Sequence, residues 1–356
     1  MERGRHSSEV AAPSSRTSFD SPIVPFPCAD RAPTIAKLPG LIGIAAMAER
    51  APLLEAKSRV EYRDIECRSI LSKCEGMPFQ WTINPYRGCE FGCHYCYARY
   101  THQYMEMHDS AAFEQKIFAK SGAAAILRRE LARGKGQGGI ALGAATDPYQ
   151  PAERRYGITR EILAVLAEAR DLNIGITTKS DLVARDIPLI LRIAKRSKIS
   201  VNMTIITLSE SLARALEQRA PRPQLRLEAV RRLREAGIEA GVSVMPVIPC
   251  ITDRYRDLDS LFAAAKSVGA SYIAANVLFL MPCAQRQFFP FLAEKFPSLV
   301  ERYRKRYEGG AYIRGEYPER IQAMVHELRE KYGLTARTKY FQPNEVVEGA
   351  KQLELF

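Results

Sequence analysis

From residue 81 onward the chain alternates between short apolar segments and longer segments whose apolar residues recur every three or four positions. Short β-branched runs are typical of buried strands, and the longer spacing is typical of amphipathic helices. This alternation implies an α/β fold with parallel strands joined by right-handed crossovers. Six units are too few for a complete eight-unit barrel. The expected strands cover residues 81–85, 139–145, 173–178, 199–206, 238–247 and 271–278.

Capping residues predict where the helices begin and end. One helix is expected to start at Asp109 or Ser110, run through Ile117 and Leu127, and stop near Gly134. Further helices are expected to begin near Thr159, Asp186 and Asp253.

The two ends of the chain differ from this central region. Residues 1–60 are rich in Ser, Pro, Ala and Arg without a sustained period, which predicts a disordered tail. Residues 61–283 form the expected core. Residues 284–356 form a basic, helical extension, with a basic run at 302–306 and a helix around 321–328, that covers the core or contacts substrate.

Composition narrows the setting in which the protein works. No apolar run approaches the length of a membrane span, so no membrane association is expected. Eight cysteines in 356 residues are sparse for a disulfide framework, which favours the cytoplasm. The 52 basic against 40 acidic residues give a formal charge of +12, which favours nucleic acid as a partner; an ordinary solvated basic surface is the alternative.

The strongest chemical signal is the segment NPYRGCEFGCHYCYARYTH, in which Cys89, Cys93 and Cys96 have C-x3-C-x2-C spacing. Three thiolates on a short loop suit a [4Fe–4S] cluster, which is held by cysteine sulfurs. With no fourth cysteine nearby, one iron is left open to bind a small molecule. A structural zinc site is the alternative, but it needs four ligands, and neither a second cysteine pair nor a well-spaced His pair follows.

Polar residues also follow several expected strands, at the end of a barrel that carries catalytic groups. Thr146 and Asp147 end the second strand, although their neighbouring prolines fit simple turn chemistry. Lys179 and Ser180 end the third strand, where an ammonium is suited to a carboxylate ligand. Thr204 lies on the fourth, where its hydroxyl is suited to a ribose or amino-acid group, although threonine also favours strands by its shape.

These motifs resemble the radical S-adenosylmethionine (SAM) superfamily. The cysteine spacing, with Tyr95 before the last cysteine, is similar to its cluster-binding signature. The segments GAATDPYQPAE, ITTKSDLVARD, SLARALEQRAPRP and MPVIPCITD add a similarity to its spore photoproduct lyase-like branch, from about residue 64 to the C-terminus. The resemblance implies a partial (β/α)6 TIM-type barrel, a [4Fe–4S] cluster on the three cysteines, and SAM bound at the open iron.

The resemblance also implies roles for individual residues. Lys179 and Thr204 fall where the lyase uses a Lys and a Ser to hold SAM. Tyr95 and Tyr97 flank the last cysteine, like tyrosines that are thought to relay a hydrogen atom in the lyase. We expect the cofactor site to be completed by Tyr95, Thr146, Asp147 and Ser180.

One position departs from the lyase pattern. Alignment on Asp147 places Ala144 where the lyase has the cysteine that donates hydrogen to the repaired thymine. We therefore expect a reaction other than that of a true photoproduct lyase. Cys250, after the fifth strand, and Cys283, after the sixth, are candidate replacements; the alternative for each is a small buried or loop residue.

The last residues suggest a protein partner. Gln352, Leu353, Leu355 and Phe356 resemble the bacterial sliding-clamp-binding motif, in which an extended end offers apolar anchors and amide hydrogen bonds to a groove. The alternative is a chain end that packs on its own barrel.

The sequence therefore predicts a radical SAM enzyme that cleaves SAM with an electron from a donor such as flavodoxin or ferredoxin. Its radical would abstract hydrogen from a substrate, and the leading candidate is a damaged base in DNA, since damaged bases are the easiest to extrude from a duplex. Two alternatives stay open. One is radical modification of RNA or protein, and the other is a non-catalytic iron–sulfur protein associated with DNA or with the clamp.

Overall fold

The computed structural model describes residues 53–57 and 60–340 of the 356-residue chain. A seven-stranded sheet forms its centre, in the order β11-β10-β9-β8-β7-β4-β3, and all neighbours are parallel except β3 and β4. The six strands expected from the sequence are confirmed to within a few residues. The strands are β3 (Leu71–Lys73), β4 (Trp81–Ile83), β7 (Ile140–Leu142), β8 (Asn173–Thr178), β9 (Lys198–Thr204), β10 (Glu239–Val247) and β11 (Ile273–Val277).

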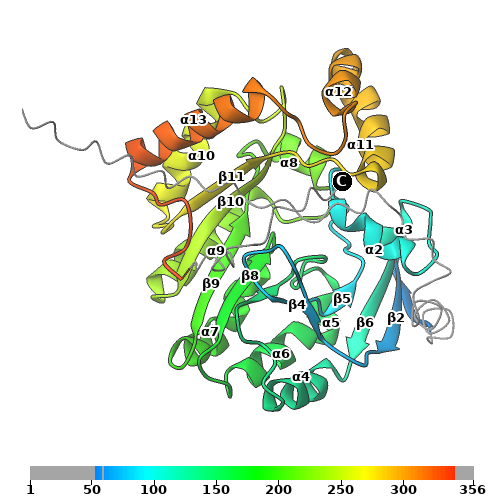
Figure 1. Ribbon diagram of the computed structural model, residues 1–356, viewed down its shortest axis with the longest axis vertical. Coiled ribbons are helices and arrows are strands. Elements are labelled where there is room, and N and C mark those ends of the chain that lie inside the picture. Colours follow the sequence, from blue (N-terminus) through cyan, green and yellow to red (C-terminus); the bar gives the residue numbers. More distant parts are fainter. Residues whose placement is uncertain (1–52, 58–59, 341–356) are drawn as a thin grey trace, which may run out of the picture.

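Helices connect successive parallel strands and cover the outside of the sheet (Figure 1). Their apolar stripes explain this position, because each helix buries one face, as α6 does with Ile162 and Leu163. The sheet edges β11 and β3 are not paired with each other in the described part of the chain, as expected for a partial barrel. The covering helices are α6 (Ile158–Leu166), α7 (Ile187–Ala194), α9 (Pro223–Glu235), α10 (Tyr255–Ser267) and α13 (Glu316–Tyr332).

A second, four-stranded sheet lies beside the first and was not foreseen from the sequence. Its order is β1-β2-β6-β5, built from β1 (Leu53–Lys57), β2 (Val60–Glu66), β6 (Lys116–Ser121) and β5 (Tyr86–Arg87). The antiparallel pairing of β5 with β6 places the start of the cysteine loop on this sheet.

The single helix expected from Asp109 to about Gly134 is wrong. The chain forms α3 (Ala112–Gln115), strand β6 and then α4 (Ala123–Ala132). A short apolar run fits a buried strand as well as a helix, and here Ile117, Phe118 and Ala119 are all fully buried because β6 pairs with both β2 and β5. Gly122, with a φ of 73°, separates the strand from α4. The helices expected near Thr159, Asp186, Asp253 and 321–328 are confirmed as α6, α7, α10 and α13.

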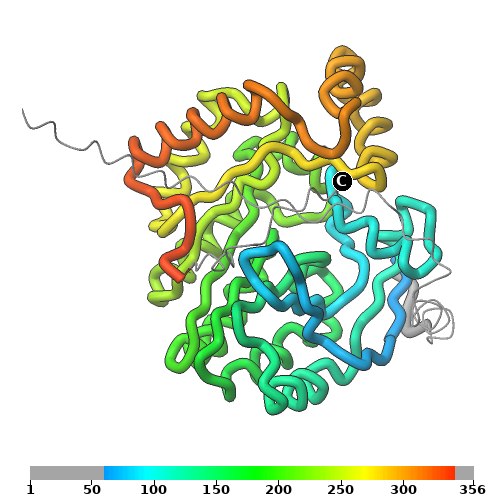
Figure 2. The backbone as a smooth tube through the Cα atoms, in the orientation of Figure 1, coloured from blue at the N-terminus to red at the C-terminus, as the bar shows by residue number. Residues whose placement is uncertain are grey.

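The C-terminal extension packs over the carboxyl ends of the last two strands. In Figure 2 it is the orange segment beside the yellow end of β11. Tyr303 and Tyr307, on α12 (Val300–Tyr307), donate hydrogen bonds to the carbonyl oxygens of Pro249 (2.6 Å) and Leu278 (2.8 Å), which follow β10 and β11. The described residues include no helix that is both long and apolar enough to span a membrane. The remaining elements are α2 (Tyr100–Gln103), α5 (Ala152–Tyr156), α8 (Glu210–Leu216), α11 (Pro282–Lys295) and the 3₁₀ helices η2 (Tyr97–Arg99), η3 (Asp181–Asp186) and η4 (Pro297–Leu299).

Candidate iron–sulfur and SAM site

The three motif cysteines lie on one loop between β5 and η2. Cys89 and Cys93 are buried, and Cys96 is half-buried. Gly88 starts the loop with a φ of 78°, and a Cβ there would lie 2.7 Å from the backbone oxygens of Phe113 and Lys116. Only glycine fits this position without strain, so Gly88 fixes the turn that leads into Cys89.

The thiols fit the donor set of an iron–sulfur cluster. Burial raises the pKa of Cys89 well above its ordinary value, with smaller contributions from Asp147, Cys93 and Cys96. The backbone also holds the loop together, since the amide of Cys96 donates to the carbonyl oxygen of Cys93 at 3.2 Å. In the described part of the chain, no three His, Cys, Asp or Glu side chains are arranged to hold a single metal ion. A [4Fe–4S] cluster does not require this, because each cysteine binds a different iron.

A buried network of charges lies against the loop. Nη1 of Arg226 is 2.6 Å from Oε2 of Glu217, and both side chains are at most 1% exposed. Nζ of Lys179 is 4.0 Å from Oε1 of Glu217 and 5.7 Å from the centre of the Tyr95 ring. The hydroxyl of Tyr95 donates a hydrogen bond to Glu217. One carboxylate therefore organises two cations and a tyrosine.

The segment after α8 holds this carboxylate against the cysteine loop. Glu217 forms an antiparallel bridge with Cys93. On either side, the amide of His94 donates to the Leu216 oxygen (3.1 Å), and the amide of Arg219 donates to the Phe91 oxygen (3.2 Å). The loop is thus fixed by backbone hydrogen bonds to the segment at the C-terminal end of α8.

Lys179 stays positively charged in this setting. Burial by itself lowers the pKa of Lys179, but Cys93, Glu217 and Asp147 more than offset it, and the pKa rises above its ordinary value. Burial and the neighbouring Glu217 raise the pKa of Tyr95 well above its usual range, so this tyrosine stays neutral and donates its hydrogen bond. The site therefore presents a fixed cation beside the loop.

Thr146 and Asp147 brace the loop and the end of β8. The Thr146 hydroxyl donates to the Gly88 oxygen at 2.6 Å. Asp147 accepts from the Thr178 hydroxyl (2.7 Å) and from the amide of Lys179 (2.7 Å). Burial raises the pKa of Asp147, and these hydrogen bonds oppose the rise. Both residues hold the backbone on which the cysteines and Lys179 sit.

The other expected cofactor residues lie at the same end of the sheet. Ser180 is buried and caps η3, since its oxygen accepts from the amide of Leu182 at 3.3 Å. Thr204 is buried at the end of β9, and its carbonyl accepts from Nη1 of Arg226 at 3.0 Å.

The two candidate hydrogen donors differ in position. Sγ of Cys283 donates to the carbonyl oxygen of Tyr97 at 3.4 Å, which places it against the cysteine loop. Sγ of Cys250 lies under α12, 3.4 Å from Nη1 of Arg302 and 3.6 Å from Nη1 of Arg306. The hydroxyl of Tyr97 donates to the carbonyl oxygen of Ala144, the position that departs from the lyase pattern. The structure thus brings Tyr97, Ala144 and Cys283 together, whereas Cys250, in the loop after β10, lies against the extension.

Sequence reasoning assigned no role to Glu217, Arg226 or Gln150. Gln150 is fully buried, donates to the Gly88 oxygen (3.0 Å), and accepts from the amide of Glu90 (3.0 Å). Its place between two prolines at a strand end was the available signal. For Glu217 the available signal was its place in the SLARALEQRAPRP segment, whereas Arg226 lies outside that segment and had none.

Gln352, Leu353, Leu355 and Phe356, which were expected to form a clamp-binding motif, lie outside the described residues, as do positions 1–52 of the predicted tail.

Comparison with known proteins agrees with this arrangement. Residues 83–262 match the family model described as the Radical SAM superfamily. An uncharacterised protein of Mycobacterium tuberculosis is 36% identical over 302 residues, which cover 83% of this chain and 88% of the relative. One from Methanocaldococcus jannaschii is 27% identical over 244 residues, covering 68% and 87%. Among solved structures, a spore photoproduct lyase complexed with dinucleoside spore photoproduct has a similar fold, with a TM-score of 0.58, 15% identity, and coverage of 76% of this chain and 79% of the lyase.

Proposed function

The chain belongs to the radical SAM superfamily, and from this premise we propose that it abstracts hydrogen from its substrate with a radical made from SAM. The observation that carries the proposal is the fixed three-cysteine loop, where Cys89, Cys93 and Cys96 would hold a [4Fe–4S] cluster. When bound, the cluster supplies the electron that cleaves SAM and so provides the 5′-deoxyadenosyl radical.

The protein's own residues prepare the place for SAM. Lys179 is a half-buried cation beside the loop, which suits it to the carboxylate of SAM. Glu217 fixes both Lys179 and Tyr95, and Arg226 neutralises Glu217 in turn. Because these groups are preorganised and shielded from water, their electrostatic effect on a bound ligand is stronger than at a surface.

For the substrate we propose a damaged base in DNA. The formal charge of +12 supports a polyanionic partner. The lyase of similar fold is complexed with a dinucleoside photoproduct. Ala144 indicates that the reaction on the base differs from photoproduct cleavage, and Cys283, against Tyr97, is the better placed of the two candidate hydrogen donors.

The test of SAM chemistry is anaerobic reconstitution with iron, sulfide, SAM and a reductant. The wild-type protein should form 5′-deoxyadenosine. Cys93→Ala should lose both the visible absorbance of the cluster and the product, whereas Cys67→Ala, which removes a cysteine outside the loop, should keep both. An intact cluster that binds SAM but gives no 5′-deoxyadenosine would support the non-catalytic alternative.

The test of the substrate class follows the hydrogen atom that is abstracted from the substrate. Ultraviolet-irradiated DNA with deuterated thymine is incubated with the reconstituted enzyme, and the 5′-deoxyadenosine is analysed by mass spectrometry. Deuterium transfer from irradiated but not from intact DNA is expected. If SAM is cleaved and no deuterium moves from either DNA, the substrate class is wrong, and RNA or protein takes its place.

A further inference from the structure

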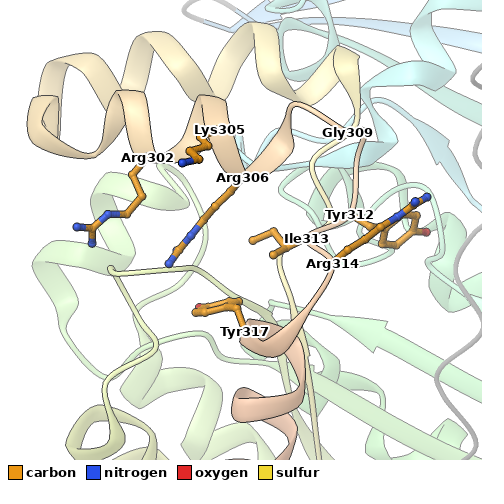
Figure 3. Close-up of a pocket in the computed structure, with 8 residues that line it drawn as sticks. All are labelled: Arg302, Lys305, Arg306, Gly309, Tyr312, Ile313, Arg314 and Tyr317. Carbon is orange, nitrogen blue, oxygen red and sulfur yellow. The ribbon is translucent and has the colours of Figure 1, made fainter.

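A cavity of about 550 Å³ lies between α12 and the segment that leads to α13 (Figure 3). Four cations line it, namely Arg302, Lys305, Arg306 and Arg314, and its described lining contains no carboxylate. Arg302, Lys305 and Arg314 are exposed, so the cavity is open to large partners.

No carboxylate in the described part of the chain neutralises the four cations. Within residues 60–340 none of them has a carboxylate oxygen within ion-pair distance, whereas Arg304, on the same helix, pairs with Glu301 at 2.7 Å. Like charges that share a cavity repel one another and attract an external anion. Arginine in particular suits phosphate, because its planar fork donates two hydrogen bonds at once.

One of these cations is held in place before any ligand arrives. The guanidinium of Arg306 stacks on the ring of Tyr317, 4.6 Å from its centre. The Tyr317 hydroxyl in turn donates to Asp253 at 2.7 Å. Figure 3 shows Arg306 pointing across the cavity toward Tyr317. An oriented arginine loses less entropy when it binds a phosphate.

The cations are spread along the cavity and do not converge on one point. In Figure 3, Arg302 and Arg306 project from α12 on one side of Ile313, and Arg314 projects on the other side, beside Tyr312. A ligand that extends along the cavity can meet both groups of cations. Successive phosphates along a strand can do so, because they repeat at the spacing of the nucleotides.

Packed aromatic rings connect the cavity to the cysteine loop. The ring of Tyr312 is 4.4 Å from that of Phe279, which is 6.3 Å from the ring of Tyr97, next to Cys96. Aromatic side chains beside a cationic groove are typical of proteins that stack the bases of single strands. The half-buried Tyr312 offers such a surface on the route to the loop.

We propose that this cavity binds the phosphodiester backbone of a nucleic-acid strand and so presents one of its bases to the cysteine loop. The presentation of a base rests on the proposed radical function, whereas the binding of the strand is independent of it.

The experiment measures binding of a fluorescein-labelled 12-nucleotide DNA single strand by anisotropy, with the reconstituted full-length protein under anaerobic conditions. The pocket variant is Arg302→Gln/Lys305→Gln/Arg314→Gln. Its matched control removes three exposed cations at the end of α7, as Arg192→Gln/Lys195→Gln/Arg196→Gln. We expect Kd to rise at least tenfold in the pocket variant and less than about twofold in the control, since charges that touch phosphates dominate affinity.

Salt dependence gives a second readout that does not depend on the absolute affinity. The slope of log K against log salt should fall in magnitude by about 2 in the pocket variant, because each lost phosphate contact on a single strand contributes about 0.7. The control slope should stay unchanged. Thermal unfolding and cluster absorbance of both variants show that a loss of binding is not a loss of folding, and Tyr312→Ala, which keeps every charge, should also weaken binding.

Three results would overturn the assignment. Equal weakening by the pocket and control variants would mean that general charge binds the strand, and unchanged binding in the pocket variant would place the strand elsewhere. Displacement of the strand by inorganic phosphate, as complete as by unlabelled DNA at equal phosphate concentration, would mean a small-anion site. Failure of the radical function appears separately, as absence of 5′-deoxyadenosine from wild-type protein whose strand binding is intact.

Discussion

The chain contains two groups of charged residues that differ in their burial and in whether they have a partner of opposite charge. Around the cysteine loop, Glu217 is matched by Arg226 and Lys179, and the Glu217–Arg226 pair is buried. In the C-terminal extension, Arg302 and Arg314 are exposed and have no carboxylate partner among the described residues.

The difference indicates which charges stabilise the fold and which are available to a ligand. A buried charge costs several kcal/mol of desolvation and survives only with a partner, so removing one member of a buried pair is expensive. An exposed cation contributes little to stability. Mutations in the first group should therefore change the free energy of unfolding, and mutations in the second should change binding.

The largest expected effect comes from Arg226→Met. It leaves the buried Glu217 without its strongest partner and should lower the free energy of unfolding by about 3–5 kcal/mol, as measured by urea denaturation of the reconstituted protein. The matched control is Arg231→Met on the same helix, whose ion pairs with Glu228 and Glu235 are exposed. Its effect should be far smaller.

A double variant sharpens this result. Glu217→Gln/Arg226→Met removes both charges, and it should recover part of the stability lost in Arg226→Met, because no unpaired carboxylate stays buried. Equal stability of the single and double variants would mean that packing by Arg226, and not its charge, supports the loop.

The next effect is a dependence on pH at His102, which is buried beside the loop. The pKa of His102 is lowered to about 4, chiefly by burial and in smaller part by Arg87, Arg99 and Lys116, while its hydrogen bond to the Lys116 oxygen at 3.0 Å opposes the shift. The unfolded chain, with a pKa near 6.5, binds more protons between these values. Stability from this group is complete above pH 6.5 and is lost as the pH falls toward 4, by about 3 kcal/mol in all.

His102→Gln keeps a side-chain donor and cannot titrate. The loss of stability between pH 6.5 and 4 should be smaller in this variant by about 3 kcal/mol. Unfolding curves at several pH values measure this difference. His108→Gln changes an exposed histidine and serves as the control. An unaltered pH profile in His102→Gln would show that other groups govern the acid sensitivity.

The strand pattern of the core could be predicted from the sequence, and the site only in part. The period and length of the apolar runs identified all six parallel strands, because a strand that is buried between helices appears in the sequence as a short, continuous apolar run. Strand β6 was mistaken for helix, since what decides its state is pairing with β2 and β5, which are remote in sequence. The cysteines were evident from spacing alone, whereas the Tyr95–Glu217 bond joins residues 122 positions apart and leaves no local pattern.

Tyr95→Phe tests that remote bond. It removes a hydrogen bond to a buried carboxylate and should cost about 2 kcal/mol of unfolding free energy. Tyr97→Phe removes a bond to the neutral carbonyl of Ala144 and should cost about 1 kcal/mol. Unchanged stability in Tyr95→Phe, together with altered 5′-deoxyadenosine formation, would indicate that Tyr95 relays hydrogen and does not position Glu217.

The smallest expected effect on stability concerns the exposed arginines of the C-terminal extension. Arg302→Gln/Arg314→Gln should change the free energy of unfolding by no more than about 0.5 kcal/mol, because both side chains are exposed and have no ion pair to lose within residues 60–340. Stability can even rise slightly as repulsion among the pocket cations falls. A destabilisation close to that of Arg226→Met would mean that these arginines pack the extension onto the strand ends. The distinction between charges that stabilise the fold and charges that are available to bind phosphate would then not hold in the C-terminal extension.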